Sequence, residues 1–163
     1  MKSVTHNVFS LGVGVYASSI TRFHLPVSLL LGAWLGVSTS FAIDAVGHTK
    51  RNGRKVRSWT AHSIFTAPLW GASLGLLTIA ISTKLTGVAL GDELLVFSTA
   101  MGVLAGYSHL LLDSLTEGGI YLGRKRAALA HFRNGNLVLN SFFVVLGVLL
   151  ALAGLGLFPL FSP

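Results

Sequence analysis

Long apolar stretches alternate with short polar segments along this chain. Uncharged apolar residues run over about residues 8–21, 27–43, 61–83, 94–112 and 137–158. A helix needs about 20 residues, at a rise of about 1.5 Å each, to cross a bilayer, and the last three stretches are long enough. The second is long enough if it continues to His48. We therefore predict five helices, over about residues 5–21, 27–48, 60–83, 93–115 and 137–158.

The first apolar stretch is marginal for a membrane crossing. It spans the bilayer only if it begins near Val4 and tilts, or if the bilayer is locally thin; otherwise it is a re-entrant or interfacial segment. Pro26 suits a helix start and disfavours helix in the residue before it, so a turn at residues 22–26 is expected to separate the first two helices. Thr60 is predicted to cap the third helix, and Gly118-Gly119 to end the fourth.

Composition leads to the same class of protein. The chain is 52% hydrophobic and only 10% charged, with a mean hydropathy of +0.73, whereas a soluble domain is about 25% charged. We therefore predict an all-α, polytopic transmembrane helix bundle that forms one integral membrane domain over residues 1–163. The chain has no cysteine, so a metal would have to be held by histidine and carboxylate side chains.

The basic residues predict the orientation of the bundle. With five crossings, ten of the twelve lysines and arginines fall on one side: Lys2, Lys50, Arg51, Arg54, Lys55, Arg57, Arg124, Lys125, Arg126 and Arg133. The positive-inside rule makes that side cytoplasmic, which puts the N-terminus in the cytoplasm and the C-terminus outside a multi-pass protein of the cell membrane. Anionic lipid headgroups are the expected partners of these loops. Nucleic acid is not expected, because no aromatic residues are interleaved with the charges for base stacking.

Ionisable residues gather at the predicted cytoplasmic ends of the helices. His109 and Asp113 are four residues apart, a spacing that places both on one face of a helix, and Asp44 and His48 repeat it. His6 and His62 fall at the same side of the membrane, at the ends of the first and third helices. His131 lies in a loop on that side, from which it could approach, whereas His24 lies on the other side.

Such a cluster has two interpretations. A single pair could be a histidine hydrogen-bonded to a helical neighbour at the membrane boundary. Convergence of several imidazoles and carboxylates instead predicts a divalent metal ion, with Zn²⁺ favoured and Mn²⁺ or Fe²⁺ as alternatives. The predicted ligands are His6, His48, His62, His109 and Asp113.

Two further residues are candidates for catalysis. Asp44 could complete the ligand shell, orient an imidazole or act as a general base. Arg57 could hold a phosphate in a bidentate grip, although it also reads as one more charge of the cytoplasmic loops. With a bound metal, these residues predict metal-assisted hydrolysis. A site at the membrane surface suggests a lipid or another amphiphilic phosphoester as the substrate.

Four motifs resemble those of a known family. They are His6-Asn7-Val8-Phe9-Ser10, Asp44 with His48, Thr60-Ala61-His62-Ser63, and residues 106–116, Gly-Tyr-Ser-His-Leu-Leu-Leu-Asp-Ser-Leu-Thr. Together they are similar to the YdjM-like family of LexA-regulated proteins, which are proposed membrane-bound metal-dependent hydrolases. The resemblance covers residues 6 to about 119 and implies a polytopic membrane protein with metal-dependent hydrolase activity.

The chain also departs from that family. Arg57 stands where the family's third-helix block has its first histidine, and the Asp44 to His48 block has one carboxylate fewer. These changes are compatible with fewer ligands, a divergent subfamily or a non-catalytic relative. Besides hydrolysis, two alternatives therefore stay open: a structural or assembly subunit, and a proton or ion carrier, which would need polar groups to continue across the membrane.

Glycine pairs predict close helix packing. Gly-x-x-x-Gly motifs begin at Gly32, Gly71 and Gly102, one on each of the three middle helices. The fifth helix carries no ionisable residue, and its Gly147 and Gly154 favour packing or a homo-oligomer surface.

Overall fold

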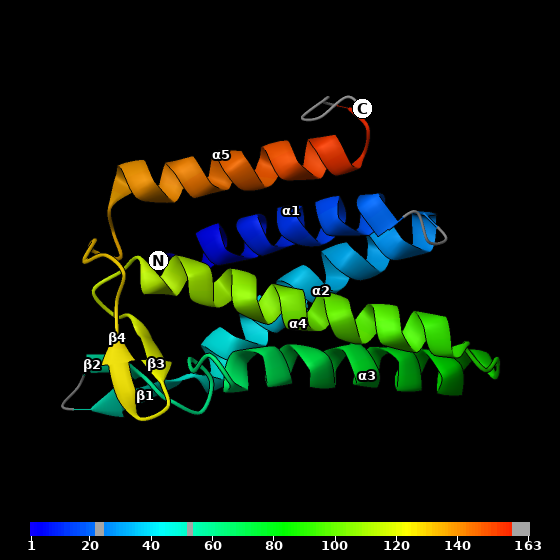
Figure 1. The fold of residues 1–163 in the computed structure, drawn as a ribbon, viewed down its shortest axis with the longest axis horizontal. Helices are drawn as coiled ribbons and strands as arrows, with labels where there is room; N and C mark the ends of the chain where they lie inside the picture. Colours follow the sequence, from blue (N-terminus) through cyan, green and yellow to red (C-terminus); the bar gives the residue numbers. More distant parts are fainter. Residues whose placement is uncertain (22–24, 52–53, 158–163) are drawn as a thin grey trace.

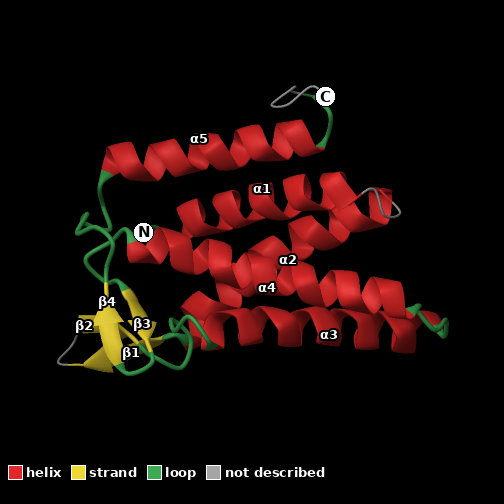
Figure 2. Ribbon diagram, viewed as in Figure 1, coloured by secondary structure: helices red, strands yellow, loops and turns green. Residues whose placement is uncertain are grey.

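The chain folds into a bundle of helices in which consecutive helices run in opposite directions, with two small β-hairpins at one end (Figures 1 and 2). A computed structural model describes residues 1–21, 25–51 and 54–157. In these residues the helices are α1 (Ser3–Thr21), α2 (Leu25–Val46), α3 (Thr66–Thr86), α4 (Asp92–Ser114) and α5 (Leu137–Gly154). The strands are β1 (His48–Arg51), β2 (Arg54–Arg57), β3 (Ile120–Leu122) and β4 (Lys125–Ala127). The predicted all-α bundle of about five helices is confirmed.

Helix α4 is the central element of the bundle. It packs against α1, α2 and α3, whereas α5 packs against α1 and forms one edge (Figure 1). The chain begins at the end that carries the hairpins, and α5 leads away from that end, so the two ends of the described chain lie at opposite ends of the bundle (Figure 1). The predicted topology, with the N-terminus and the C-terminus on opposite sides of the membrane, requires the two ends to be so placed. Which end faces the cytoplasm stays a prediction.

Four of the helices are long and apolar enough to cross a membrane: α2, α3, α4 and α5. Helix α1 is not among these four, although its 19 residues extend over about 28 Å. Its buried side includes Thr5, His6, Ser10 and Ser18. These polar residues thus point into the protein, where other helices rather than lipid surround them. Whether α1 crosses the bilayer stays open.

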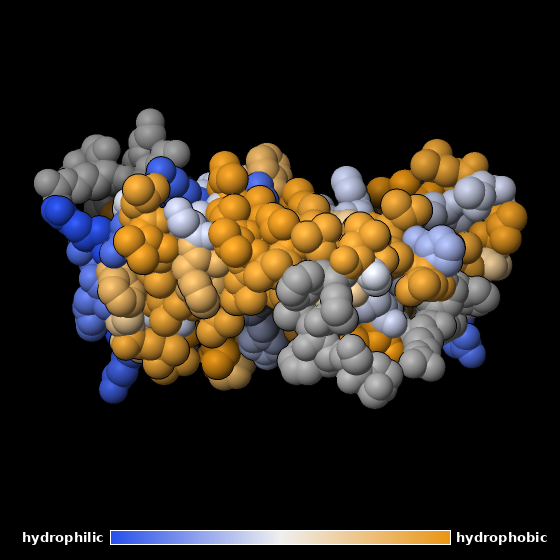
Figure 3. Space-filling view, turned by 90° about the horizontal axis from the view of Figure 1, so that it is seen from above, coloured by the Kyte–Doolittle hydropathy of each residue, from blue (hydrophilic) through white to orange (hydrophobic). Residues whose placement is uncertain are grey.

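The surface of the bundle suits lipid. Large apolar side chains such as Leu30, Leu69 and Val138 are exposed on the helices, and apolar residues form a broad band over them (Figure 3). Hydrophilic residues gather at the hairpin end in the same view (Figure 3). Exposed apolar residues around a partly polar interior indicate a membrane protein, because lipid rather than water covers the helices.

Glycines bring the helix backbones into direct contact. A Cβ atom on Gly71 would lie 1.8 Å from the carbonyl oxygen of Gly102, and one on Gly14 would lie 2.1 Å from that of Gly32. No side chain fits at such distances, so the predicted grooves serve helix packing. Gly147 of α5 packs in the same way against Val8 of α1. These glycines serve packing within the chain, and the predicted homo-oligomer stays a prediction.

Several helix boundaries differ from the prediction, and two of the differences affect the candidate site. Helix α3 begins at Thr66 rather than at residue 60, and Phe65 rather than Thr60 is its N-cap residue. Helix α2 ends at Val46, so His48 lies in β1 and not on the helix of Asp44. Both changes have one cause: the chain between β2 and α3 folds back onto the end of α2, where the Ser58 N–H donates to the carbonyl of Gly47 over 2.7 Å.

The hairpins were predicted only as loops, and they hold most of the basic residues. The β1–β2 pairing places His48 opposite Arg57, which brings both residues to the root of that hairpin. The β3–β4 hairpin turns at Gly123, whose φ of 65° suits glycine. The predicted turn at residues 22–26 lies partly outside the described residues, and the structure places the start of α2 at Leu25.

Candidate metal centre

The structure brings all seven predicted site residues to one place at the hairpin end of the bundle. His6 comes from α1, Asp44 from the last turn of α2, and His109 and Asp113 from the last two turns of α4. His48 and Arg57 come from the first hairpin, and His62 from the segment before α3. His131 is exposed and belongs to neither of the ligand groups described below.

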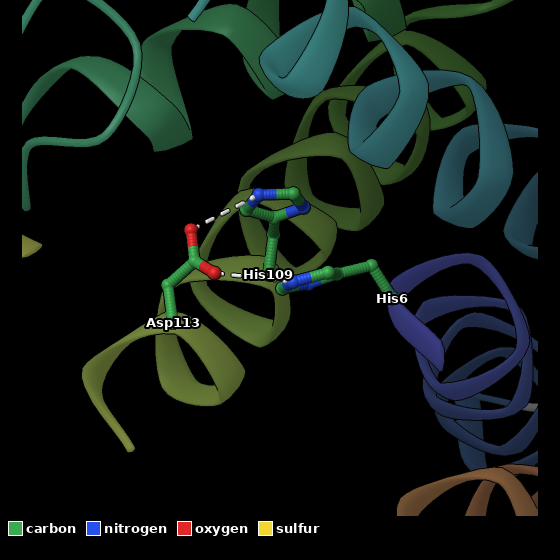
Figure 4. Close-up of side chains that lie close together, drawn as sticks. All are labelled: His6, His109 and Asp113. Carbon is green, nitrogen blue, oxygen red and sulfur yellow. Dashed lines mark ion pairs between the residues drawn. The ribbon is translucent and has the colours of Figure 1, made fainter. Parts of the chain in front are cut away.

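Asp113 lies at the centre of the cluster and is fully buried. Its Oδ1 atom is 3.1 Å from His6 Nε2, and its Oδ2 atom is 3.4 Å from His109 Nε2. Figure 4 shows the carboxylate beside the two imidazoles, with one oxygen directed at each. The two rings are stacked, with centroids 4.1 Å apart. Helix α4 thus places His109 and Asp113 on one face, as their spacing predicted, and α1 adds His6.

His62 closes the cluster from the side of the hairpins. Its Nε2 atom is 3.5 Å from Asp113 Oδ2, and its carbonyl accepts a 2.9 Å hydrogen bond from the Tyr121 N–H, which ties the segment to β3. A Cβ atom on Gly47 would lie 2.2 Å from His62 Cε1, so only glycine leaves room for the ring. Burial lowers the pKa of His62 to about 3. His62 is therefore uncharged at neutral pH, which a metal ligand must be.

Asp44 and His48 form the more exposed part of the cluster. Asp44 Oδ1 is 3.7 Å from His109 Nε2 and 3.9 Å from His48 Nδ1. Ser3 donates a 2.9 Å hydrogen bond to Asp44 Oδ2. His48 Nδ1 lies 2.7 Å from the backbone carbonyl of Asp44. Because a carbonyl only accepts, Nδ1 carries the proton and the lone pair of neutral His48 is on Nε2.

Both terminal nitrogens of Arg57 donate hydrogen bonds to other residues of the chain. Nη2 donates to Asp113 Oδ1, and Nη1 donates to Thr116 Oγ1 and to the carbonyl of Gly119 over 3.0 and 3.1 Å. A Cβ atom on Gly118 would collide with this guanidinium. In this arrangement Arg57 holds Asp113 in place. The predicted bidentate grip on a phosphate stays a prediction and requires some of these bonds to open.

A polar cavity of about 410 Å³ opens beside the cluster. Asp44, His48 and Arg57 line it on the side of the cluster, and Tyr121 and Arg126 of the second hairpin line it as well. Two arginines and one carboxylate suit an anionic or phosphate-bearing ligand. The cavity gives a ligand access to Asp44 and His48 from the hairpin end.

Sequence reasoning missed Ser40, which supports His109 from behind. Its Oγ atom is 3.0 Å from His109 Nδ1, and both residues are fully buried. If Ser40 accepts from Nδ1–H, the lone pair of His109 is on Nε2, the atom that faces Asp44 and Asp113. Ser40 precedes Asp44 by four residues on α2, so the helical spacing that revealed the other pairs could have identified it.

Three buried atoms at the centre of the cluster have no hydrogen-bond partner among the described residues. They are Asp113 Oδ2, His62 Nε2 and His109 Nε2. A buried polar atom without a partner costs about 1–3 kcal/mol, so such atoms seldom occur together by chance. Their separations of 3.4 and 3.5 Å fit ligands of tetrahedral zinc, which lie about 3.3 Å apart when each is about 2.0–2.1 Å from the ion. The donor set therefore fits a divalent cation.

Fold and site together define the chain as a helical membrane protein with a buried histidine and aspartate cluster at one end of the bundle. Residues 1–112 match the family model described as "Protein of unknown function (DUF1286)". Because the match covers more than half of the chain, the protein belongs to this family. The matched range includes every predicted site residue except Asp113, which directly follows the last matched residue. Neither the search of curated proteins nor that of solved structures found a match.

Proposed function

We propose that this protein is a membrane-embedded, metal-dependent hydrolase that acts at the cytoplasmic membrane surface. The observation that carries the proposal is the group of three unpartnered, buried donor atoms on His62, His109 and Asp113. Binding of divalent metal at this cluster, with Zn²⁺ favoured and Mn²⁺ or Fe²⁺ as alternatives, would satisfy these atoms. The resemblance to the YdjM-like family points to the same activity.

The side chains around the ion have separate tasks in this proposal. A divalent ion in such a site supplies activation of water and polarisation of a phosphoryl or acyl oxygen. Asp44 lies on the cavity wall, where it can take a proton from an attacking water or orient His109. Arg57 holds Asp113 in position through its guanidinium.

The second hairpin supports an amphiphilic substrate. Tyr121 and Arg126 line the polar cavity, whereas their neighbours Ile120, Leu122 and Ala127 line an apolar pocket of about 320 Å³. Side chains alternate along a strand, so the two faces of this hairpin meet two different environments. A phosphoester or lipid-like molecule, with a charged head for the cavity and an apolar part for the membrane, suits this border.

Metal content tests the proposal first. The protein, purified in detergent without added chelator, is analysed for its elements beside His109→Ala and the control His131→Ala. We expect divalent metal in the wild type and in the control, and loss of metal in His109→Ala. A pure wild-type protein that binds no divalent metal overturns the proposal.

Hydrolysis is the second test. The metal-loaded protein is assayed for release of phosphate or fatty acid from vesicles that contain anionic phospholipids, and with a chromogenic phosphodiester. We expect a turnover that disappears with chelator and in Asp44→Asn. A protein that binds metal but hydrolyses none of these substrates would instead be a non-catalytic, structural or assembly subunit.

A further inference from the structure

The cluster contains two sets of potential ligands rather than one. Each set has two imidazoles and one carboxylate whose donor atoms lie within 4.8 Å of one another. The inner set is His6, His109 and Asp113, all buried. The outer set is Asp44, His48 and His62, of which the first two are partly exposed. One divalent ion needs only one such set, because catalytic sites often use three protein ligands.

The inner set is shaped for an ion. One donor atom of each of its three side chains lies within 4.8 Å of the other two. The carboxylate of Asp113 faces both rings, with Oδ1 3.1 Å from His6 Nε2 and Oδ2 3.4 Å from His109 Nε2. The stacked rings of His6 and His109, inclined by only 22°, show that the two imidazoles lie nearly parallel beside the carboxylate.

The outer set is also prepared for a ligand. The Asp44 carbonyl fixes the proton of His48 on Nδ1, which leaves Nε2 with its lone pair. Both ring nitrogens of His62 are buried and have no hydrogen-bond partner in the part of the chain that the structure describes. His62 therefore has one nitrogen more than its contact with Asp113 requires. Asp44 supplies the carboxylate and lines the polar cavity together with His48.

The two sets touch each other at two points. His62 Nε2 is 3.5 Å from Asp113 Oδ2, and His109 Nε2 is 3.7 Å from Asp44 Oδ1. Each of these distances joins a donor atom of one set to a donor atom of the other. Enzymes that use two metal ions for phosphoester hydrolysis hold them about 3.5–4 Å apart, in adjacent ligand sets of this kind.

We propose that the cluster binds two divalent cations, an inner ion held by His6, His109 and Asp113 and an outer ion held by Asp44, His48 and His62. The outer ion faces the polar cavity and the substrate. Two divalent cations beside two carboxylates leave a net positive charge, to which Arg57 adds, so the loaded site selects an anionic substrate such as a phosphoester. This inference rests on the proposed metal-dependent function and specifies its site and substrate class.

Stoichiometry tests the inference directly. The metal-stripped protein in detergent is dialysed against Mn²⁺ or Zn²⁺, and bound metal per chain is determined by elemental analysis. We expect two ions per chain in the wild type and in the control His131→Ala, whose ring lies outside both sets. His48→Ala removes a partly exposed ligand of the outer set and should retain one ion.

The outcomes separate this inference from the proposed function. A wild-type count of one ion overturns the two-ion site but leaves a mononuclear hydrolase, and a count of zero overturns both. Two ions in His48→Ala, or none, also contradict the assignment of the outer set. Electron paramagnetic resonance of the Mn²⁺-loaded protein gives an independent readout. Spin coupling between two manganese ions is expected in the wild type and should disappear in His48→Ala.

Discussion

Replacement of Ser40 by alanine tests how much the contact between Ser40 and His109 contributes to metal binding. Ser40→Ala removes a single oxygen atom that lies 3.0 Å from His109 Nδ1 in a fully buried place. A bound metal must use Nε2, which faces Asp44 and Asp113, so the proton of the ring is then held on Nδ1. Without the serine this N–H is buried and unpaired. In the metal-free protein the ring can move its proton to Nε2 and donate to a carboxylate.

The cost of Ser40→Ala therefore falls mainly on the metal-bound form. An unpaired buried donor costs about 1–3 kcal/mol, which corresponds to roughly a 5- to 150-fold change in affinity. Loss of an outer partner of a ligating histidine costs about 10- to 100-fold. We expect the dissociation constant for Zn²⁺ to rise by about 10- to 100-fold, while the melting temperature of the metal-free protein changes little.

Competition with a chromophoric chelator in detergent measures this affinity at constant pH. Ser18→Ala is the matched control, because Ser18 is equally buried but donates to the Gly14 carbonyl of its own helix over 2.7 Å. Unchanged affinity in Ser40→Ala would refute the role of this hydrogen bond. An equal loss in Ser18→Ala would show that the effect is not specific to His109.

Three other predictions concern packing, pH and charge. Gly71→Ala places a Cβ atom 1.8 Å from the Gly102 carbonyl oxygen. We expect thermal melts to show that this variant is less stable than the wild type by at least about 1–3 kcal/mol. In the control Gly135→Ala the added Cβ atom meets nothing within 4 Å, so its stability should equal that of the wild type. The pKa of His62 is about 3 in the folded protein, against an ordinary value of 6.5, so the unfolded chain takes up the proton first as pH falls. The metal-free protein should therefore lose stability below about pH 6.5, by about 2 kcal/mol at pH 5. Thermal melts of His62→Leu should show a weaker dependence of stability on pH. Asp113→Asn leaves the guanidinium of Arg57 without its counter-charge and should lower the free energy of unfolding by about 3–5 kcal/mol, measured by chemical unfolding. A decrease of less than about 1 kcal/mol would contradict the central place of this carboxylate.

Hydropathy predicted the bundle because the membrane imposes strong constraints on sequence. A spanning helix must be long and apolar, and the basic segments must lie on one side, so the five helices and their alternation could be read from the chain. The common location of His6, His62 and His109 followed from that alternation alone. The ends of the helices, unlike their existence, depend on tertiary contacts, and this is where the predictions failed.

His48 illustrates that failure. Its spacing from Asp44 predicted a shared helix face, but α2 ends at Val46 and His48 begins a strand. The two residues are close all the same, since His48 Nδ1 contacts the Asp44 carbonyl. The dipeptide Asn52-Gly53 is a sequence signal for a hairpin and could have predicted β1 and β2, although it lies outside the described residues. No local signal predicts the contact of His62 with β3.

The energetics of the cluster argue against a purely structural role. Five buried atoms of its side chains lack a hydrogen-bond partner among the described residues: His6 Nδ1, both ring nitrogens of His62, His109 Nε2 and Asp113 Oδ2. At about 1–3 kcal/mol each, five such atoms together cost about as much as the whole net stability of a typical domain, about 5–15 kcal/mol. Well-packed apolar residues would stabilise this end of the bundle better than an incompletely paired polar group. Ions that bind these atoms only in the folded state stabilise that state by mass action. The gain in the free energy of unfolding is about 4 kcal/mol when the ion concentration is a thousand times the dissociation constant. These unpaired atoms therefore support the proposed metal centre.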